Sequence, residues 1–338
     1  MTISLEEFLA MKGPCFDVRS PKEYCHAKIP GATNLALFSD VERAIVGTAY
    51  KQQGKDIAVR LGIKIVGPKL DSMLTSALEH DFSCHKARVY CWRGGMRSGF
   101  VKYFLETAGI ASVQLKGGYK AFRRFALNTL AKPCKLFILG GFTGCGKTEV
   151  LQALKQENVP TVDLEAIACH KGSVYGSLDG KAQPSNEQFE NELALNLFNF
   201  KSDEPIWVED ESRLIGRCQI PNSFYEVMSH APLFILNSSK EARMRRILAE
   251  YGSFPREHLY ESTKKLEKRL GGAKTKAVLQ FIEQNAAFEA MNLLLDYYDE
   301  AYEHALSRHA GPIIRLSEGD LTPSLWAERL RQASSIPL

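Results

Sequence analysis

The fold of the first part of this chain is decided by the stretch Val89-Tyr90-Cys91-Trp92-Arg93-Gly94-Gly95-Met96-Arg97-Ser98-Gly99. A short apolar run over residues 87–90 predicts a buried strand, and a helical pattern follows over residues 98–106. In a loop between the end of a strand and the start of a helix, several backbone N–H groups point inward at the positive end of the helix dipole. The stretch therefore predicts an anion-binding loop in an α/β fold.

The cysteine in this loop is expected to be reactive. A thiol in such a field is shifted toward thiolate, the nucleophilic form, and an arginine six residues later can hold an anion with two hydrogen bonds. The pattern indicates a cradle for a tetrahedral oxyanion, or for a group carried on sulfur, with a nucleophile at its floor. We predict that the catalytic residues are Cys91, Trp92, Arg93, Gly94, Gly95 and Arg97. The alternative is a buried structural cysteine before a tight turn, the commonest role of a free cysteine.

Length and composition predict two domains in a reducing compartment. The 338 residues exceed what one hydrophobic core usually supports, and we place the boundary between residues 1–130 and 131–338. The net charge of +4 is mild. None of the eight cysteines forms a CxxC pair, which excludes zinc-ribbon and thioredoxin sites. With no signal-peptide pattern and no apolar run long enough to span a membrane, we expect a cytoplasmic protein with free thiols that does not bind a membrane.

A second anion site is predicted near the middle of the chain. An apolar strand over residues 135–140 leads into a G-x4-G-K-[ST] motif, and a helix over residues 148–156 follows. In such a P-loop the backbone N–H groups wrap phosphates, Lys147 reaches the terminal phosphates and Thr148 binds Mg²⁺. The alternative is a glycine-rich turn with an exposed lysine. The predicted phosphate-binding residues are Gly141, Thr143, Gly144, Cys145, Gly146, Lys147 and Thr148.

Acidic and basic side chains expected near this P-loop come from later segments. Residues 205–212 are apolar and then acidic, which is typical of a Walker B strand, and we favour Asp210 over Glu209 as the residue that holds Mg²⁺ through water. Solvated acids at a helix start are the alternative. The helix after the strand at residues 231–237 carries Arg243, Arg245 and Arg246, which either contact phosphate or form a solvated face.

The densest basic cluster lies further along, on a predicted helix and a Gly-Gly turn. Such clusters bind phosphate backbones, and a basic solvated helix is the alternative. The long helix predicted over residues 286–304 carries Tyr297, Tyr298 and Tyr302, an aromatic spacing that more often marks a core than a base-stacking surface. The predicted nucleic-acid contacts are Lys264, Lys265, Lys268, Arg269, Lys274 and Lys276.

The first 130 residues resemble a rhodanese domain. The resemblance is carried by Asp17-Val18-Arg19-Ser20-Pro21-Lys22-Glu23-Tyr24, then Ile29-Pro30-Gly31-Ala32-Thr33-Asn34, then the cysteine loop, in the family's order. It implies that sulfur is carried as a persulfide on Cys91. The loop from Cys91 to Arg97 is one residue longer than the usual rhodanese loop. This Cys-X5-Arg spacing resembles that of cysteine phosphatases and suits a larger anion than thiosulfate.

The order of motifs along the whole chain resembles the tRNA 2-selenouridine synthase family, in which a rhodanese domain is fused to a P-loop domain. The matching segments are residues 46–54, 90–98, 141–148 and 208–212. The resemblance implies an α/β fold with a rhodanese-like domain followed by a P-loop NTPase-like parallel-sheet domain. It also implies a transferase that replaces sulfur by selenium at position 2 of wobble 5-substituted 2-thiouridine in tRNA.

The same resemblance implies the substrates and partners. Selenophosphate is the selenium donor, and an S-geranyl-2-thiouridine intermediate is made from geranyl diphosphate; selenophosphate synthase is the expected partner besides tRNA. No bound organic cofactor is expected, and Mg²⁺ is expected at the P-loop. Phe142, beside the P-loop, is expected to face the isoprenoid.

Three other functions fit part of the pattern. The Cys-X5-Arg spacing alone fits a phosphatase with a nucleotide-binding domain. The P-loop fits an ATP-dependent tRNA thiolation enzyme that adenylates uridine. The basic cluster fits a non-catalytic module that binds tRNA or a nucleotide. The sequence leaves open whether the P-loop holds geranyl diphosphate or a nucleotide.

Overall fold

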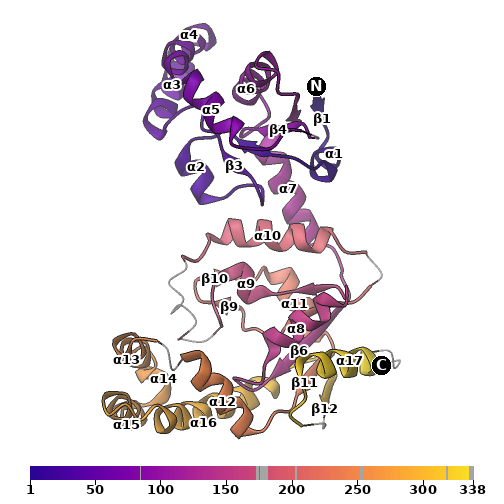
Figure 1. Ribbon diagram of the computed structural model, residues 1–338, viewed down its shortest axis with the longest axis vertical. Helices are drawn as coiled ribbons and strands as arrows, with labels where there is room; N and C mark the ends of the chain where they lie inside the picture. Colours follow the sequence, from indigo (N-terminus) through magenta and orange to yellow (C-terminus); the bar gives the residue numbers. More distant parts are fainter. Residues whose placement is uncertain are drawn as a thin grey trace. The chain divides into compact units, whose positions relative to one another are not determined.

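The computed structural model describes residues 1–83, 85–172, 175, 182–201, 204–251, 254–316 and 319–334, so Cys84 lies outside the described part. The chain divides into two compact units (Figure 1). Unit 1 comprises Met1–Thr129 together with Glu190–Leu195, and unit 2 comprises Leu130–Phe189 and Asn196–Leu338. Each unit is described by itself.

Unit 1 is built on a parallel sheet. Within the described residues the sheet has five strands in the order β1-β5-β4-β2-β3, and each pairing is parallel. This order puts β4 in the centre, so the residue after it, Cys91, lies at the carboxyl edge of the sheet. The elements are β1 (Thr2–Ile3), α1 (Leu5–Ala10), β2 (Cys15–Asp17), α2 (Pro21–His26), β3 (Thr33–Asn34), α3 (Asp40–Gln52), α4 (Lys55–Val66), a 3-10 turn (Gly67–Lys69), α5 (Leu70–Leu78), β4 (Ala87–Tyr90), α6 (Met96–Thr107), β5 (Ser112–Leu115) and α7 (Gly118–Leu130).

Local sequence signals explain the helix starts in unit 1. A capping box at Ser39 and Glu42 begins α3, because the serine oxygen accepts from the Glu42 N–H and the glutamate accepts from the Ser39 N–H. Gly54, with φ of +95°, makes the turn into α4. A helix pair, α3 and α4, therefore lies between β3 and α5. The helix after the cysteine loop begins at Met96, two residues before the predicted start at residue 98.

Unit 2 is also built on a parallel sheet, so the predicted α/β class is confirmed. The described strands form a five-stranded sheet in the order β12-β11-β6-β8-β7, with a separate antiparallel pair, β9 and β10. The elements, of which α10 has its middle residues Glu190–Leu195 in unit 1, are β6 (Leu136–Gly141), α8 (Lys147–Gln156), β7 (Thr161–Val162), α9 (Leu164–Ala168), α10 (Asn186–Phe198), β8 (Ile206–Glu209), β9 (Leu214–Ile215), β10 (Cys218–Gln219), α11 (Asn222–His230), β11 (Leu233–Leu236), α12 (Lys240–Tyr251), α13 (Arg256–Lys264), α14 (Glu267–Leu270), α15 (Gly272–Glu283), α16 (Ala287–Leu306), β12 (Ile313–Leu316) and α17 (Pro323–Ser334).

The strand order of unit 2 places the site. β6 is central, so the P-loop that follows it lies at the carboxyl edge of the sheet between the ends of β8 and β11. The acidic residues after β8 and the arginine helix after β11 therefore flank the P-loop. Beneath it, the rings of Phe137, Trp207 and Phe234 pack with centroids 5.0 to 5.4 Å apart. In Figure 1 the helices α12 to α16 form a separate layer beside this sheet, and they share their own apolar core.

Two local predictions are corrected. The sequence of residues 162–165 predicts the end of a strand, but β7 stops at Val162, because the Asp163 carboxylate accepts from the Ala166 N–H and caps α9. Residues 271–272 were expected to be a turn. Only Gly271 has a positive φ, of +85°, and Gly272 already begins α15.

Among the described residues, no helix combines the length and apolar character that crossing a membrane requires.

Candidate functional site

The loop after β4 is clamped onto the start of α7. The N–H groups of Tyr119 and Lys120 donate to the carbonyls of Cys91 and Trp92 at 2.8 and 2.9 Å. The approach requires glycine at Gly94, where φ is +64° and a Cβ would lie 2.3 Å from a backbone oxygen of β5. No atom lies within 4 Å of a Cβ placed on Gly95, so the loop is open on that side.

The sulfur of Cys91 lies at the floor of this loop, where 3% of the residue is exposed. Burial disfavours the thiolate. Hydrogen bonds from the Ser98 hydroxyl, at 3.1 Å, and from the Ser98 N–H act against that cost, as do Arg97 and the Gly95 N–H. The net effect of these groups is to lower the pKa of Cys91. Backbone donors, a hydroxyl and a guanidinium therefore converge on one sulfur. This is the environment of a nucleophilic thiol.

Gln114 supports the cradle from the neighbouring strand β5. Its side-chain N–H₂ lies 2.8 Å from the Ser98 hydroxyl oxygen and donates to the carbonyls of Gly94 and Gly95 at 2.9 and 3.0 Å. The two amide hydrogens are shared among these three oxygens, and the Ser98 hydroxyl lies within reach of the Cys91 sulfur, at 3.1 Å, and of the Gly95 carbonyl, at 3.3 Å. Gln114 and Ser98 were not among the predicted site residues. Gln114 carries no sequence signal, because only the pairing of β4 with β5 brings it to the loop.

Arg97 is held by Glu23, from α2. One oxygen of Glu23 accepts from Arg97 and from Arg43 of α3, each at 3.2 Å. Although burial opposes ionisation, Arg97, the Ser20 N–H and Arg43 lower the pKa of Glu23. The cradle is thus joined to the helix pair α3–α4 through one ionised carboxylate. Glu23 had a sequence signal as the acidic partner of a capping box, but the signal did not indicate a role beside Arg97.

The other predicted cradle residues lie at its rim. Arg93 is exposed, and Trp92 is 39% exposed with its ring 5.6 Å from that of Tyr119. Below them Arg19, 1% exposed, forms a buried ion pair with Asp17 at 2.6 Å, and its guanidinium lies 3.9 Å from the centre of the Tyr119 ring. The predicted entry motif therefore builds the support under the loop.

In unit 2, the P-loop leads directly into α8. Gly144 and Gly146 have φ of +79° and +93°, and a Cβ on Gly144 would lie 2.8 Å from Ile247 of α12. The Lys147 ammonium donates to the Gly141 carbonyl at 3.2 Å. Burial would lower the pKa of Lys147, but the charges of Cys145, Glu211 and Glu165 raise it above its usual value. Lys147 therefore stays cationic while it bonds to the first residue of the P-loop.

A group of carboxylates, one buried and the others half-buried, lies near this lysine. Glu209 is 1% exposed, and one of its oxygens accepts from the Glu165 N–H at 3.3 Å while the other has no partner among the described residues. Burial, followed by the charges of Asp163, Glu165 and Glu211, raises the pKa of Glu209 well above its ordinary value. Burial and Glu165 raise the pKa of Glu211 to about 8. These carboxylates therefore have more negative than positive charge around them.

Asp210, the predicted Walker B residue, is tied to a tyrosine. The Tyr302 hydroxyl donates to the Asp210 carboxylate at 2.8 Å and accepts from the Gly141 N–H at 2.9 Å. A Cβ on Gly140 would lie 2.5 Å from that hydroxyl. Tyr302 was expected to be a core residue. It instead links α16 to the first glycine of the P-loop, a contact that only the tertiary structure creates.

Two of the three arginines of α12 reach the P-loop. Arg243 donates to both oxygens of Asp299 at 2.8 and 2.7 Å and lies 5.1 Å from the centre of the Phe142 ring. Arg246 donates to the Gly144 carbonyl at 3.4 Å, whereas Arg245 is exposed. The Phe142 ring is also 5.4 Å from that of Tyr302.

Mg²⁺ fits the donors at this site. No group of three or more His, Cys, Asp or Glu suited to a metal occurs in the described part of the chain. A P-loop cation, however, takes most of its ligands from phosphate and water and few from the protein. The Thr148 hydroxyl lies at the start of α8, and the carboxylates of Asp210 and Glu209 follow β8, with one Glu209 oxygen unpartnered.

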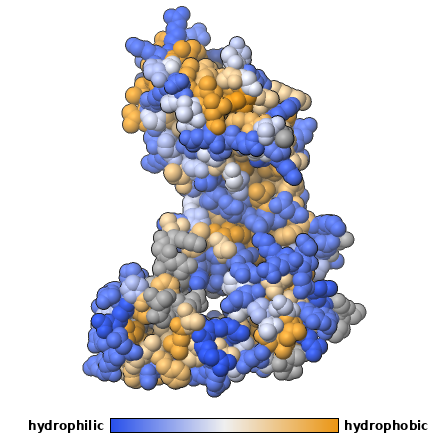
Figure 2. All heavy atoms as spheres, viewed as in Figure 1, coloured by the Kyte–Doolittle hydropathy of each residue, from blue (hydrophilic) through white to orange (hydrophobic). Residues whose placement is uncertain are grey.

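The predicted basic cluster spans three helices and is exposed. Lys264 ends α13, Lys268 and Arg269 lie on α14, and two further lysines lie on α15. Lys264 pairs with an adjacent glutamate at 3.3 Å. Figure 2 shows hydrophilic surface over α13 and α15.

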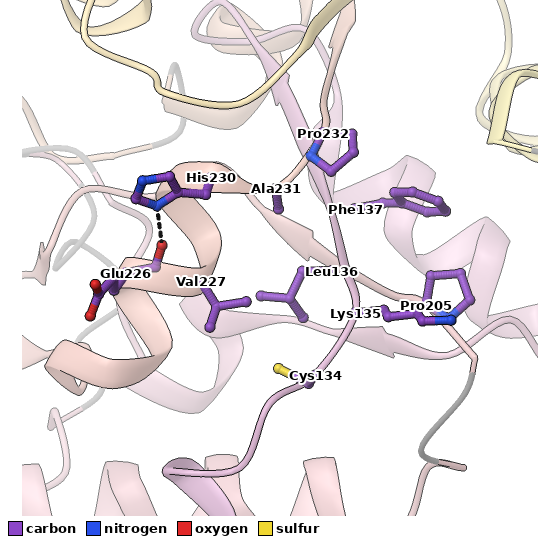
Figure 3. Close-up of a pocket in the computed structure, with 10 residues that line it drawn as sticks. All are labelled: Cys134, Lys135, Leu136, Phe137, Pro205, Glu226, Val227, His230, Ala231 and Pro232. Atoms are coloured by element: carbon purple, nitrogen blue, oxygen red, sulfur yellow. Dashed lines mark hydrogen bonds between the residues drawn. The ribbon is translucent and has the colours of Figure 1, made fainter. Parts of the chain in front are cut away.

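A cavity of about 730 Å³ opens at the opposite edge of the unit 2 sheet (Figure 3). It lies where β6, β8 and β11 begin, and Leu136, Pro205 and Pro232 line it. The P-loop follows the other end of β6. This cavity therefore takes no part in the anion site.

The chain is similar to known proteins over most of its length. The family model of the tRNA 2-selenouridine synthase AAA domain matches residues 134–329. A protein of Pseudomonas syringae pv. syringae named tRNA 2-selenouridine synthase is 36% identical over 336 residues, covering 89% of this chain and 90% of that protein. One of the same name from Aeromonas salmonicida is 34% identical and covers 94% and 93%. A solved N-terminal domain of an ATP/GTP-binding protein from Clostridium difficile 630 is 39% identical, with a TM-score of 0.35, and covers 38% of this chain and 99% of that one.

Proposed function

The chain belongs to the tRNA 2-selenouridine synthase family, and from that premise we propose that it replaces sulfur by selenium at position 2 of wobble 5-substituted 2-thiouridine in tRNA. The proposal has two stages. Geranyl diphosphate first alkylates the sulfur, and selenium from selenophosphate then displaces the S-geranyl group. The observation that carries the proposal is the presence of two different anion-binding loops, one with a thiol at its floor and one with a lysine.

Unit 1, which we propose to be a rhodanese-like domain, suits the selenium stage. Its cradle offers backbone N–H groups, Ser98 and Arg97 around a buried thiol, and these donors suit the phosphoryl oxygens of selenophosphate. The free thione sulfur of thiouridine is a poor leaving group. Alkylation converts it into a thiolate leaving group, so selenium entry is easier after geranyl transfer.

Unit 2 suits the geranyl stage. A P-loop needs only a diphosphate and a divalent cation, and geranyl diphosphate supplies the diphosphate as ATP would. Lys147, Arg246 and the loop N–H groups would hold it, and Thr148, Asp210 and Glu209 would hold Mg²⁺. The cation would neutralise the departing diphosphate. The sequence predicts that Phe142 faces the isoprenoid. Its ring packs against Arg243 and Tyr302, so only part of the ring surface is left for that contact.

The exposed basic cluster on α13, α14 and α15 is the proposed tRNA contact, because lysine and arginine clusters neutralise phosphates. The wobble nucleotide has to leave its stack to reach either loop. Selenophosphate synthase is the proposed source of the selenium donor.

The test is mass analysis of tRNA nucleosides after incubation with geranyl diphosphate and then selenophosphate. Wild type is expected to form S-geranyl-2-thiouridine and then 2-selenouridine. Lys147→Ala should block the first product, and Cys91→Ser should allow the first and block the second. Lys155→Ala, an exposed lysine at the other end of α8, is the matched control.

Other outcomes identify the alternatives. ATP consumption coupled to modification, with geranyl diphosphate ignored, indicates the adenylating thiolation enzyme. Turnover of phosphate esters without any tRNA product indicates the phosphatase, and tRNA binding without turnover indicates a binding module. Each of these results contradicts the proposal.

A further inference from the structure

The donors around Cys91 define how a tetrahedral anion sits in the cradle. The Ser98 hydroxyl, the N–H groups of Ser98 and Gly95, and Arg97 surround the sulfur. When the donors that bind the three oxygens of a tetrahedral anion surround one protein atom, the central atom of the anion lies over that protein atom. The oxygens of selenophosphate carry most of its charge. Bound in this way, selenophosphate would place its phosphorus over the sulfur and point its selenium to the side of the loop where a Cβ on Gly95 would meet no atom within 4 Å.

We propose that the Cys91 thiolate attacks the phosphorus of selenophosphate and releases the selenium as hydroselenide beside the base. The inference rests on the proposed function, which supplies selenophosphate as the donor. The sulfur lone pair forms the S–P bond, and the P–Se electron pair leaves on selenium, opposite the attacking atom as in-line displacement requires. Attack on selenium would turn the phosphoryl oxygens away from Arg97 and the loop N–H groups.

The later steps balance without an oxidant or a reductant. Hydroselenide attacks carbon 2 of the S-geranylated base, the C–Se bond forms, and the C–S pair leaves on the geranyl thiolate, which takes up a proton. Water then attacks the phosphocysteine, the S–P pair returns to sulfur, and inorganic phosphate leaves. Ser98 assists this last step, because the hydroxyl that donates to the sulfur at 3.1 Å stabilises the departing thiolate.

The charge of Glu23 limits which leaving groups the site accepts. Among the described residues, Glu23 is the acid that pairs with the loop from 91 to 98, and it bonds to both Arg97 and Arg43. A carboxylate shared by two guanidiniums stays ionised and cannot protonate a leaving group. Hydroselenide and hydrosulfide leave as stable anions without help, whereas an alkoxide needs a general acid, whose contribution is typically 10²–10⁴-fold.

The first experiment uses the full chain without tRNA. Wild type is mixed with selenophosphate under anaerobic conditions, or with inorganic thiophosphate. The reaction is quenched in denaturant, and the masses of the cysteine peptides are measured by mass spectrometry. One phosphoryl group is expected on the Cys91 peptide. It should be absent in Cys91→Ser and unchanged in Cys25→Ser, the control at an exposed cysteine of the same unit. In Ser98→Ala the phosphocysteine should form but decay about tenfold more slowly, as expected for loss of a hydrogen bond to a charged group.

Two results overturn the inference. One is a selenium or sulfur atom on Cys91 in place of a phosphoryl group, which indicates attack on the chalcogen. The other is phosphate release from phosphoserine within about tenfold of that from thiophosphate, because the missing general acid predicts at least about 100-fold. The nucleoside analysis separates these failures from that of the proposed function: phosphoryl capture without 2-selenouridine contradicts the function alone, and 2-selenouridine without phosphoryl capture contradicts this inference alone.

Discussion

The loop after Cys91 and the P-loop occupy the same position in their sheets and differ in the charges placed around them. Each follows a central strand of a parallel sheet and opens a helix, α6 in unit 1 and α8 in unit 2. In the described part of the chain, the carboxylate paired with the loop after Cys91 is Glu23, which two arginines neutralise. Around Lys147 lie several carboxylates, of which Glu209 is buried and the others are half-buried. The same loop becomes a nucleophilic site or a binding site according to the side chains that neighbouring elements deliver.

The largest expected effect concerns the support beneath the cradle. Arg19→Met should lower the free energy of unfolding by about 3–5 kcal/mol, since it leaves the buried Asp17 carboxylate without its partner. The measurement is urea unfolding of the full chain. Arg93→Met, at the exposed rim, is the control and should change little. A loss below about 1 kcal/mol would mean that the cradle does not rest on this ion pair.

The next effect separates the loops by ligand. Lys147→Ala should weaken diphosphate binding by about 10–100-fold, the loss expected when a charged hydrogen-bond donor is removed. Calorimetric titration with inorganic diphosphate and Mg²⁺ measures it. Alkylation of Cys91 in the same variant should be unchanged. If binding persists, the lysine does not contact the anion.

The carboxylates of unit 2 predict a pH dependence of stability. The pKa of Glu211 is raised to about 8 from its usual value near 4.5, so between these values the folded state keeps a proton that the unfolded state releases. The free energy of unfolding therefore falls as pH rises through this range. Glu211→Gln should raise the melting temperature by a few degrees more at pH 8 than at pH 5. Equal gains at both pH values would show that Glu211 is ionised in the folded protein.

A smaller effect tests the thiol. Ser98→Ala removes a donor to the thiolate, so the pKa of Cys91 should rise and less thiolate should exist at pH 7. Alkylation by iodoacetamide, followed on the Cys91 peptide, should slow about tenfold at pH 7, with its midpoint moved to higher pH. Ser72→Ala, on α5, serves as the control. An unmoved midpoint would leave Arg97 and the loop N–H groups as the stabilising donors.

The smallest effect lies on the surface of unit 2. Lys268→Ala should weaken tRNA binding a few-fold and lower the slope of log affinity against log salt by about 0.7–0.9, the contribution of one phosphate contact. Filter binding over a range of salt concentrations measures both. Lys201→Ala is an exposed control. The same slope in both variants would place the tRNA elsewhere.

Much of the fold followed from local patterns. The strand before Cys91, the strand before the P-loop and the helix that follows each loop were all predicted and are present. Apolar runs, capping residues and glycines act over a few residues, so the sequence displays them directly. The strand predicted to extend to residue 165 failed because Asp163 prefers to cap a helix.

The site was only partly visible in the sequence. Cys91, Lys147 and the acidic run after β8 stand in motifs whose spacing carries their chemistry. Gln114 and Tyr302 stand in no motif, and each reaches its loop from an element distant in the chain. No periodicity distinguishes such residues from ordinary strand or core positions.

The sequence by itself determined the α/β class, the positions of the two candidate loops and the family, because these depend on residue types at short spacing. The tertiary structure alone decided the charge state of each loop. The pairing of β4 with β5 brings Gln114 to Ser98, and α2 brings Glu23 to Arg97. The order of strands in unit 2 gathers Glu165, Glu209 and Glu211 beside Lys147. A pKa depends on burial and on charges a few ångströms away in space, and sequence distance does not report either quantity.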